Sequence, residues 1–481
     1  MKLRSQIDLT QGNAIKCLLL FAFPLFIENL INILYNVVDS SIIGQIIPNQ
    51  YAGIADTSNL IGLATFFISA CGMGFGAVVG YFFGAKNKEK TRQAIAKSYT
   101  LSLIIGVILS IIMVSLLEVL LNMLNLSKDI DYNTWYTARC YAFVIFVSLP
   151  ITVVANTTIF SLRNLGNSTF PLITSVLSGF LNALLTFILV KFVDDIYWKV
   201  RCAAIATVFS QLVKFIICFI YARHKYEQFR FKGKDLFLDQ EITKRLLTNS
   251  IPIGLEWVVI GFGLFFISGA VVSFDNAASA SIGYIVSDAQ NAYGASNNIK
   301  AFIYAFGGSL SGAIVSFTAQ NYGAKQYNRL ITSFKDINKL IIISYLILFG
   351  GVMLLTIKGA FLYIFLDASK INDNTVRYAF LTILFAGGLM FFKNINDVYS
   401  KALIGLEKPL IPSITGFVEL AIRFFLVLLI RKIIPDPYGT LGFIIVVGAE
   451  PISWIASSTL SFIYARKAFK EFPKEDNTII S

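Results

Sequence analysis

The sequence predicts an all-α integral membrane protein with twelve transmembrane helices in two pseudo-symmetric six-helix bundles. Of its 481 residues, 56% are hydrophobic and only 14% are charged, whereas a soluble domain has about 25% charged residues. Apolar stretches that could cross a bilayer, which takes about 20 residues per helix, recur along the whole chain. The two halves also share short motifs in the same order. This composition excludes a soluble enzyme, a disordered chain and a secreted disulfide scaffold.

The expected spans follow from the apolar runs, with ends uncertain by about four residues. They are 15–43, 59–84, 98–121, 138–161, 170–192, 202–221, 251–272, 299–322, 340–355, 378–399, 410–430 and 443–464. We expect them to form an N-terminal lobe at 1–223 and a C-terminal lobe at 251–466. A cytoplasmic linker at 224–250 joins the lobes, and a cytoplasmic tail occupies 467–481.

The net charge of +12 is concentrated in alternate connections. Lys and Arg gather after the second span, after the eighth, in the linker and in the tail. The opposite connections carry more acids, among them Asp129, Asp131, Asp194, Asp367 and Asp436. The positive-inside rule then places both termini of a multi-pass membrane protein in the cytoplasm. Topology explains the basic loops, so no nucleic-acid partner is expected.

The chain contains an internal duplication. The segment Phe-Ile-Tyr-Ala-Arg occurs at 219–223 and again at 462–466, and Gly-Ala-Lys occurs at 84–86 and 323–325. Pro and Glu four residues apart recur as Pro24 and Glu28, then as Pro252 and Glu256. Six spans per half is an even number, so the two halves have the same orientation. Parallel repeats of this kind are typical of transporters that rock one bundle against the other.

Polar side chains inside the spans are candidates for function, because a charge at the bilayer centre costs about 2.5–3.5 kcal/mol on insertion scales. The first span has one polar stripe at helical spacing, formed by Glu28, Asn32, Tyr35, Asn36 and Asp39. Asp39, together with Asn36, is a candidate proton or cation site, and Glu28, together with Asn32 and Tyr35, is a candidate substrate-binding group. Both could instead be structural carboxylates that are hydrogen-bonded between helices.

The fifth and sixth spans add neutral oxygen ligands. Asn182 and Thr186 share one face of the fifth span, and Thr207 lies in the sixth. With a carboxylate from the first span, these side chains would form a hard-oxygen site for H⁺ or Na⁺. Ordinary hydrogen bonding between helices is the alternative interpretation.

The second half carries more charge. Glu419 and Arg423 occupy the positions that match Asn182 and Thr186, and their spacing predicts an ion pair, as does that of Lys393 and Asp397. Glu256 and Glu450 have no oppositely charged neighbour in their own spans, which makes them candidates for binding a cation. A substrate-binding role for all six stands beside a purely structural one.

Other chemistries lack their residues. The chain has one histidine, and it contains no HExxH, P-loop or GxSxG motif. Zinc catalysis, ATP hydrolysis and a Ser-His dyad are therefore not expected. We expect a protein that is not an enzyme and has no cofactor.

Several of these features resemble the multidrug and toxic compound extrusion (MATE) transporters. The resemblance lies in Pro24 followed by Tyr35-Asn36-Val37-Val38-Asp39 and Gly44, in the repeated Gly-Ala-Lys, in Arg163-Asn164-Leu165-Gly166-Asn167, and in Asn182 with Ala204-Ile205-Ala206-Thr207. It covers nearly the whole chain.

The resemblance implies a secondary antiporter of the inner (plasma) membrane that exports organic, often cationic and amphipathic, compounds in exchange for H⁺ or Na⁺ by alternating access. It maps a cation site onto Asp39, Asn182 and Thr207. Many members carry a second Asp where this chain has Thr186, which favours H⁺ here. The wider superfamily includes flippases for lipid-linked saccharides, and this alternative remains open. The partners expected are a small organic substrate and the lipid bilayer, with the chain as a monomer.

Overall fold

The computed structural model describes residues 6–473 except 47, 125, 127, 129, 130, 284, 285, 357 and 358. The side chains of 35–41, 44, 46, 48–52, 55, 56, 59, 355 and 430 are also outside the described part. Within it, all regular structure is helical, as the composition predicts.

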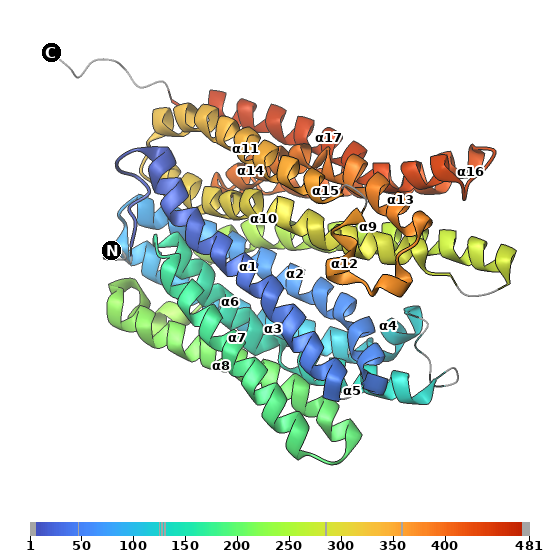
Figure 1. Ribbon diagram of the computed structural model, residues 1–481. Helices are drawn as coiled ribbons and strands as arrows, with labels where there is room; N and C mark the ends of the chain where they lie inside the picture. The colour runs from blue at the N-terminus through green and yellow to red at the C-terminus, as the bar shows by residue number, and fades with distance from the viewer. Residues whose placement is uncertain are drawn as a thin grey trace. The chain divides into compact units, whose positions relative to one another are not determined.

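The first half contains α1 to α8 (Figure 1). Their bounds are α1 Ala14–Ile46, α2 Pro48–Gly84, α3 Lys88–Ser115, α4 Leu117–Met123, α5 Tyr132–Val147, α6 Leu149–Asn164, α7 Thr169–Phe192 and α8 Ile196–Lys225. The connection to the second half contains two short 3₁₀ turns, η1 Glu227–Phe229 and η2 Gly233–Leu236.

The second half contains α9 to α17, and wider π turns interrupt two of its helices. The bounds are α9 Gln240–Ile282, α10 Asp288–Gly323, α11 Tyr327–Thr356, α12 Leu362–Phe365, η4 Ala368–Lys370, α13 Asp373–Thr382, η5 Ile383–Gly387, α14 Met390–Gly405, α15 Leu410–Phe425, η6 Leu426–Ile430, α16 Arg431–Ile433 and α17 Thr440–Lys470. The π turns are η5 and η6.

The described residues contain 11 helices that are long and apolar enough to cross a membrane, or up to 12 if α5 and α6, which meet at a 51° bend, count as one span. These match the predicted spans one for one. Several helices begin earlier than predicted: α3 begins at Lys88 and α9 at Gln240. Hydropathy detects the apolar core of a span, while the polar first turns continue the same helix outside it.

The chain forms two compact units. Unit 1 contains residues 1–258 and 315–325, and unit 2 contains residues 259–314 and 326–481. Helices α9 and α10 therefore contribute to both. The lobe boundaries expected from the sequence differ from this division, and they remain a prediction.

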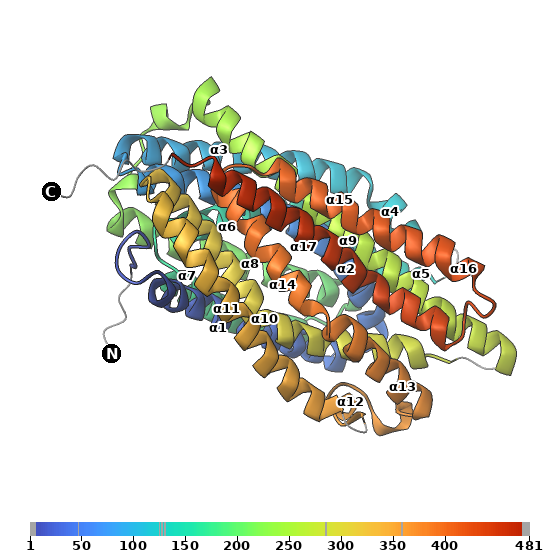
Figure 2. The ribbon, with the colours of Figure 1, turned by 90° about the horizontal axis from the view of Figure 1, so that it is seen from above.

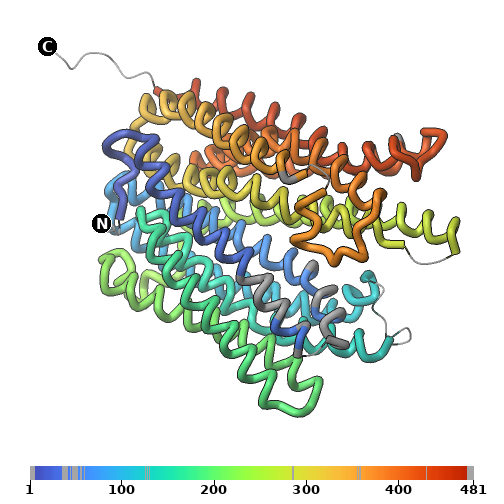
Figure 3. Tube along the Cα trace, in the orientation of Figure 1, coloured from blue at the N-terminus to red at the C-terminus, as the bar shows by residue number. Residues whose placement is uncertain are grey.

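In unit 1, α7 packs against both α1 and α8, and α6 packs against α2 and α3. Figure 3 follows the chain through the hairpin that α7 and α8 form. The backbone N–H of Ile7 donates to the carbonyl of Gly166 at 2.9 Å, so the segment before α1 lies beside the turn before α7. These two helices therefore begin at the same end of the unit.

The two copies of Gly-Ala-Lys meet within unit 1. A Cβ on Gly84 would lie 2.0 Å from the carbonyl oxygen of Gln320, and one on Gly323 would lie 1.9 Å from that of Tyr81. The lysines that follow, Lys86 and Lys325, both have left-handed backbones, with φ of 56° and 59°. The repeated motif thus has the same local conformation twice, and its glycines permit close helix contact.

In unit 2, α17 packs against α14 and α15, as the view from above shows (Figure 2). The span that contains α13 and α14 is interrupted by η5, where a π turn leaves carbonyl groups without their usual partners. The Tyr345 hydroxyl on α11 donates to the carbonyls of Gly387, at 3.0 Å, and of Gly388. The single hydroxyl of Tyr345 is therefore shared between two carbonyl groups at the break in the helix.

Candidate functional site

A neutral polar cluster joins α7 to α8 in unit 1. The amide nitrogen of Asn182 donates to Thr207 Oγ1 at 3.1 Å, and Thr186 donates to the amide oxygen of Asn182 at 2.9 Å. Asn182 and Thr186 are buried. The structure thus brings together these three residues of the predicted cation site.

The predicted site also includes residues of the first helix. Tyr35, Asn36 and Asp39 lie on α1, but their side chains are outside the described residues. Asn32, one turn before Asn36, is exposed.

Glu28 is buried and fully engaged. Its carboxylate accepts from Arg163 Nη2 at 2.7 Å and from Ser175 Oγ at 2.6 Å, so it links α1 to α6 and α7. Lys214 on α8 adds a second favourable charge interaction. The spacing of residues along α1 could not predict the contact of Glu28 with Arg163, which is 135 positions away. Glu256, the other acid of the repeated Pro-Glu motif, is buried on α9.

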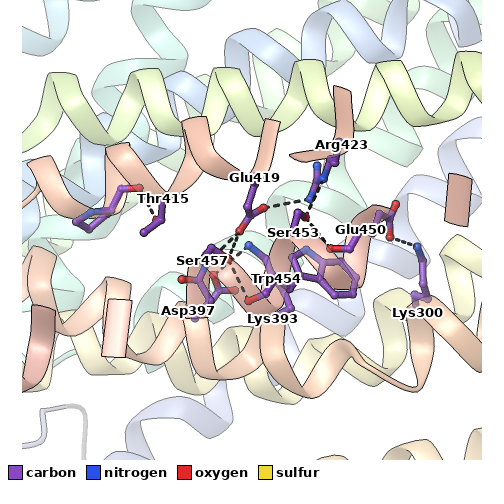
Figure 4. A network of polar contacts seen from close by, with 12 residues as sticks. Lys300, Lys393, Asp397, Thr415, Glu419, Arg423, Glu450, Ser453, Trp454 and Ser457 are labelled. Atoms are coloured by element: carbon purple, nitrogen blue, oxygen red, sulfur yellow. Dashed lines mark hydrogen bonds and ion pairs between the residues drawn. The ribbon is translucent and has the colours of Figure 1, made fainter. Parts of the chain in front are cut away.

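Unit 2 has an ion pair where unit 1 has amide and hydroxyl groups. Arg423 Nη2 lies 3.1 Å from Glu419 Oε2, and both side chains are 1% exposed. Asn396 and Ser457 donate to the other carboxylate oxygen at 3.1 and 2.8 Å, and Arg423 Nε donates to Ser453 Oγ at 3.2 Å. Figure 4 shows Glu419 between Arg423 and Ser457. The ion pair predicted from the spacing is confirmed.

Glu450 on α17 is connected to this network through Ser453, which donates to the carbonyl of Glu450. Lys300 Nζ lies 2.7 Å from Glu450 Oε2 (Figure 4). The Tyr293 hydroxyl donates to Glu450 Oε1 at 2.8 Å. Both Lys300 and Glu450 are buried. The sequence interpretation considered only partners within the same span, and it missed this one because Lys300 lies on α10, 150 positions away.

The third pair, Lys393 and Asp397, is also present. Lys393 Nζ lies 3.2 Å from Asp397 Oδ1, and the Tyr304 hydroxyl donates to Asp397 Oδ2. The three carboxylates Asp397, Glu419 and Glu450 thus each have a cation in contact. Polar groups in membrane spans are tolerated when they are paired in this way. The described residues contain no group of three or more His, Cys, Asp and Glu that could hold a metal ion.

Fold and polar interior together define the class of protein. Multiple membrane-crossing helices, an internal duplication and ionisable groups within the spans are the features of a membrane transporter built from repeats.

The comparisons with known proteins identify the family. The MatE family model matches residues 24–188 and 264–429, once in each half of the chain. The chain therefore belongs to the MatE family of transporters.

Curated relatives are distant but extensive in coverage. One is the "Probable multidrug resistance protein YoeA" of Bacillus subtilis (strain 168), 25% identical over 344 residues, which covers 70% of each chain. Another is the "Multidrug export protein MepA" of Staphylococcus haemolyticus (strain JCSC1435), 22% identical over 346 residues, which covers 71% of each.

Solved structures share the fold. The "Crystal structure of MATE in complex with MaL6" has a TM-score of 0.82 at 18% identity and covers 97% of this chain and 99% of that one. A transporter from Pyrococcus furiosus, described with "Reverse polarity of binding pocket suggests different function", has a TM-score of 0.82 at 18% identity, and covers 98% and 100%. These likenesses confirm the predicted all-helical membrane fold with two bundles.

Proposed function

We propose that this protein is a secondary antiporter that exports organic compounds in exchange for inward H⁺. Family membership and the names of relatives such as the multidrug export protein of Staphylococcus haemolyticus support export of small molecules. The observation that carries the proposal is the register of α1 against α7, which aligns position 39 with the neutral polar cluster.

The contact between Glu28 and Ser175 fixes this register. Both helices begin at the same end of unit 1, and each rises about 1.5 Å per residue. Position 39 lies eleven residues beyond Glu28, and Thr186 lies eleven residues beyond Ser175. The backbone of α1 at position 39 therefore shares a level with Thr186, one turn from Asn182. An acid at this level is suited to bind the coupling ion.

The cluster favours H⁺ over Na⁺. Sodium needs several oxygen ligands, whereas the amide oxygen of Asn182 already accepts from Thr186, and Thr207 donates to the carbonyl of Ala203 at 3.3 Å. Among the described side chains of the cluster there is no carboxylate. A single acid at position 39 is sufficient for a proton.

The test is transport by the full chain in proteoliposomes under separately imposed H⁺ and Na⁺ gradients, with a cationic dye as substrate. We expect Asp39→Asn to abolish H⁺-driven transport. Asp131→Asn is the matched control, because Asp131 caps α5 outside the spans and Asn is an equally good cap. Full H⁺-driven transport by Asp39→Asn would overturn the coupling role.

For the substrate, we propose cationic amphipathic compounds, with a role for the intramembrane acids in their recognition. The second candidate is a flippase for a lipid-linked saccharide or another amphipathic lipid precursor. One observation favours it: Arg163, Lys300, Lys393 and Arg423 neutralise the carboxylates that they contact. Competition between the dye and a lipid-linked saccharide in the same vesicles distinguishes the two.

A further inference from the structure

The segment between α8 and α9, residues 226–239, folds onto α3 and is called the strap below. Arg92 Nε donates to Asp235 Oδ2 at 3.0 Å, and Lys97 pairs with Asp239. The Thr100 hydroxyl donates to the carbonyl of Leu236 at 2.9 Å. These contacts fix the strap along the first three turns of α3, within unit 1.

Each of the three acids in the strap pairs with a basic residue of α3, whereas two of its lysines are exposed. Asp235 is buried against Arg92, and Asp239 is engaged by a buried Lys97. Glu227 pairs with Lys88 at 2.9 Å. Lys232 and Lys234 are exposed on either side of Gly233. The outer face of the strap therefore has a positive charge.

The tip of the strap is apolar and exposed. Leu236, Phe237 and Leu238 follow one another, and Phe237 is 77% exposed. Three consecutive exposed apolar residues are unfavourable in water. An aromatic residue next to basic ones is typical of the boundary between a bilayer and water.

The position of the tip on α3 indicates what covers it. Thr100, which holds Leu236, lies one turn before Ile104, and α3 from there on has an exposed apolar face that includes Leu103, Ile104, Val107 and Ile108. One turn is about 5.4 Å. The apolar tip thus lies beside the exposed apolar face of a helix that is long enough to cross a membrane, and Lys232 and Lys234 directly precede the tip in the strap.

We propose that the strap is a membrane-surface anchor that inserts Phe237 and Leu238 into the leaflet on the side where α3 begins. In that position Lys232 and Lys234 bind anionic lipid headgroups. The partner is an anionic bilayer surface. This surface is separate from the transport site and adds lipid recognition to the protein.

The test places a fluorophore at the tip in the full chain. Cys17 and Cys202, the two native cysteines that are not buried, are first changed to Ser. Phe237→Cys is then labelled with an environment-sensitive dye and reconstituted into phosphatidylcholine vesicles with or without phosphatidylglycerol. Brominated lipids quench a label in the bilayer, and iodide quenches a label in water. Lys244→Cys, exposed on α9, is the control position.

We expect bromolipid quenching at position 237, stronger with phosphatidylglycerol, and iodide quenching at position 244. The double variant Lys232→Gln/Lys234→Gln should reduce the equilibrium constant for insertion by about thirtyfold in anionic vesicles, because each Lys near the surface contributes about 1 kcal/mol. Equal iodide quenching at 237 and 244 would overturn the proposal, and so would identical insertion in the two kinds of vesicle. Size-exclusion profiles verify that every variant is folded.

Discussion

The two halves of this protein use the same helical positions for different chemistry. In unit 1, Asn182 on α7 contacts Thr207 on α8, and Ser210 donates to the carbonyl of Thr207 at 2.8 Å. The shift of 243 positions that relates the two Phe-Ile-Tyr-Ala-Arg segments relates Thr207 to Glu450 and Ser210 to Ser453. Ser453 donates to the carbonyl of Glu450 at 2.6 Å, so the local geometry is repeated.

The side chains on this shared backbone differ in charge. Asn182 and Thr186 are matched by Glu419 and Arg423, and Ile61, by the shift that relates Gly84 to Gly323, is matched by Lys300. Unit 1 thus has a neutral cluster where unit 2 has two buried ion pairs. A neutral cluster is suited to a single titrating acid, whereas paired charges need one another to remain buried.

The first prediction breaks the more buried pair of unit 2. Arg423→Met should lower the free energy of unfolding by about 3–5 kcal/mol, because it leaves the carboxylate of Glu419 buried without its cation. Thermal unfolding of the purified protein in detergent measures the loss. Adding Glu419→Gln should restore most of the stability.

Lys408→Met is the control for this experiment. Lys408 pairs with Glu471 at the surface, with side chains 37% and 53% exposed, so its loss should be too small to detect. A loss for Arg423→Met no larger than for Lys408→Met would show that the pair has no such role.

The second prediction converts unit 2 toward unit 1. Lys300→Ile alone should cost about 3 kcal/mol, since it removes the cation in contact with the buried carboxylate of Glu450. The double variant Lys300→Ile/Glu450→Thr has the residues found at the matching positions of unit 1. Its loss in the free energy of unfolding should be smaller than that of Lys300→Ile by at least about 1 kcal/mol. Additive losses in this double-mutant cycle would mean that the two charges do not depend on each other.

The fold was largely predictable from the sequence, and the pairing of charges only in part. Apolar runs define spans whatever their neighbours are, so every expected span has its helix. The pairs Glu419–Arg423 and Lys393–Asp397 were predictable because residues four apart share a helix face. Two other pairs, Arg163 with Glu28 and Lys300 with Glu450, join different helices. A single sequence gives no information on the distance between residues of different helices. The position of Lys300, a charged residue at the edge of a predicted span, was the one indication in the sequence of a buried pair.

The third prediction compares the same substitution in both units. Asn182→Ala removes one neutral hydrogen bond and the acceptor of Thr186, which should cost about 1 kcal/mol. Asn396→Ala removes a donor to the carboxylate of Glu419 and the acceptor of Ser461 at 2.7 Å. Bonds to charged groups contribute about 1.5–3 kcal/mol, so the loss in unit 2 should be larger. Thermal unfolding of the two variants side by side measures the difference, and equal losses would remove the energetic distinction between the units.

The last and smallest effect concerns the segment that follows α8 in unit 1 and the segment that follows α17 in unit 2. In unit 1, burial alone would raise the pKa of Asp239, but the hydrogen bonds from Lys97 and the Ile242 backbone lower it below its ordinary range. Burial likewise opposes the hydrogen bonds from Lys232 and Arg92 that lower the pKa of Asp235. A lowered native pKa means that these contacts stabilise the strap fully above about pH 4, and that this stabilisation is lost as the pH falls through the native pKa.

The mobility of a spin label at Phe237→Cys should therefore be unchanged between about pH 7 and pH 5 and should rise only below about pH 4. Asp235→Asn, which weakens the attachment to Arg92, should raise the mobility at every pH. Salt gives the opposite contrast: the exposed Lys408–Glu471 pair of unit 2 should weaken in about 1 M salt, whereas the contact of Arg92 with the buried Asp235 carboxylate in the strap should not. Release of the strap near pH 6 would show that Asp235 and Asp239 titrate above the ordinary pKa range of Asp, which would contradict the lowered pKa values of these two acids.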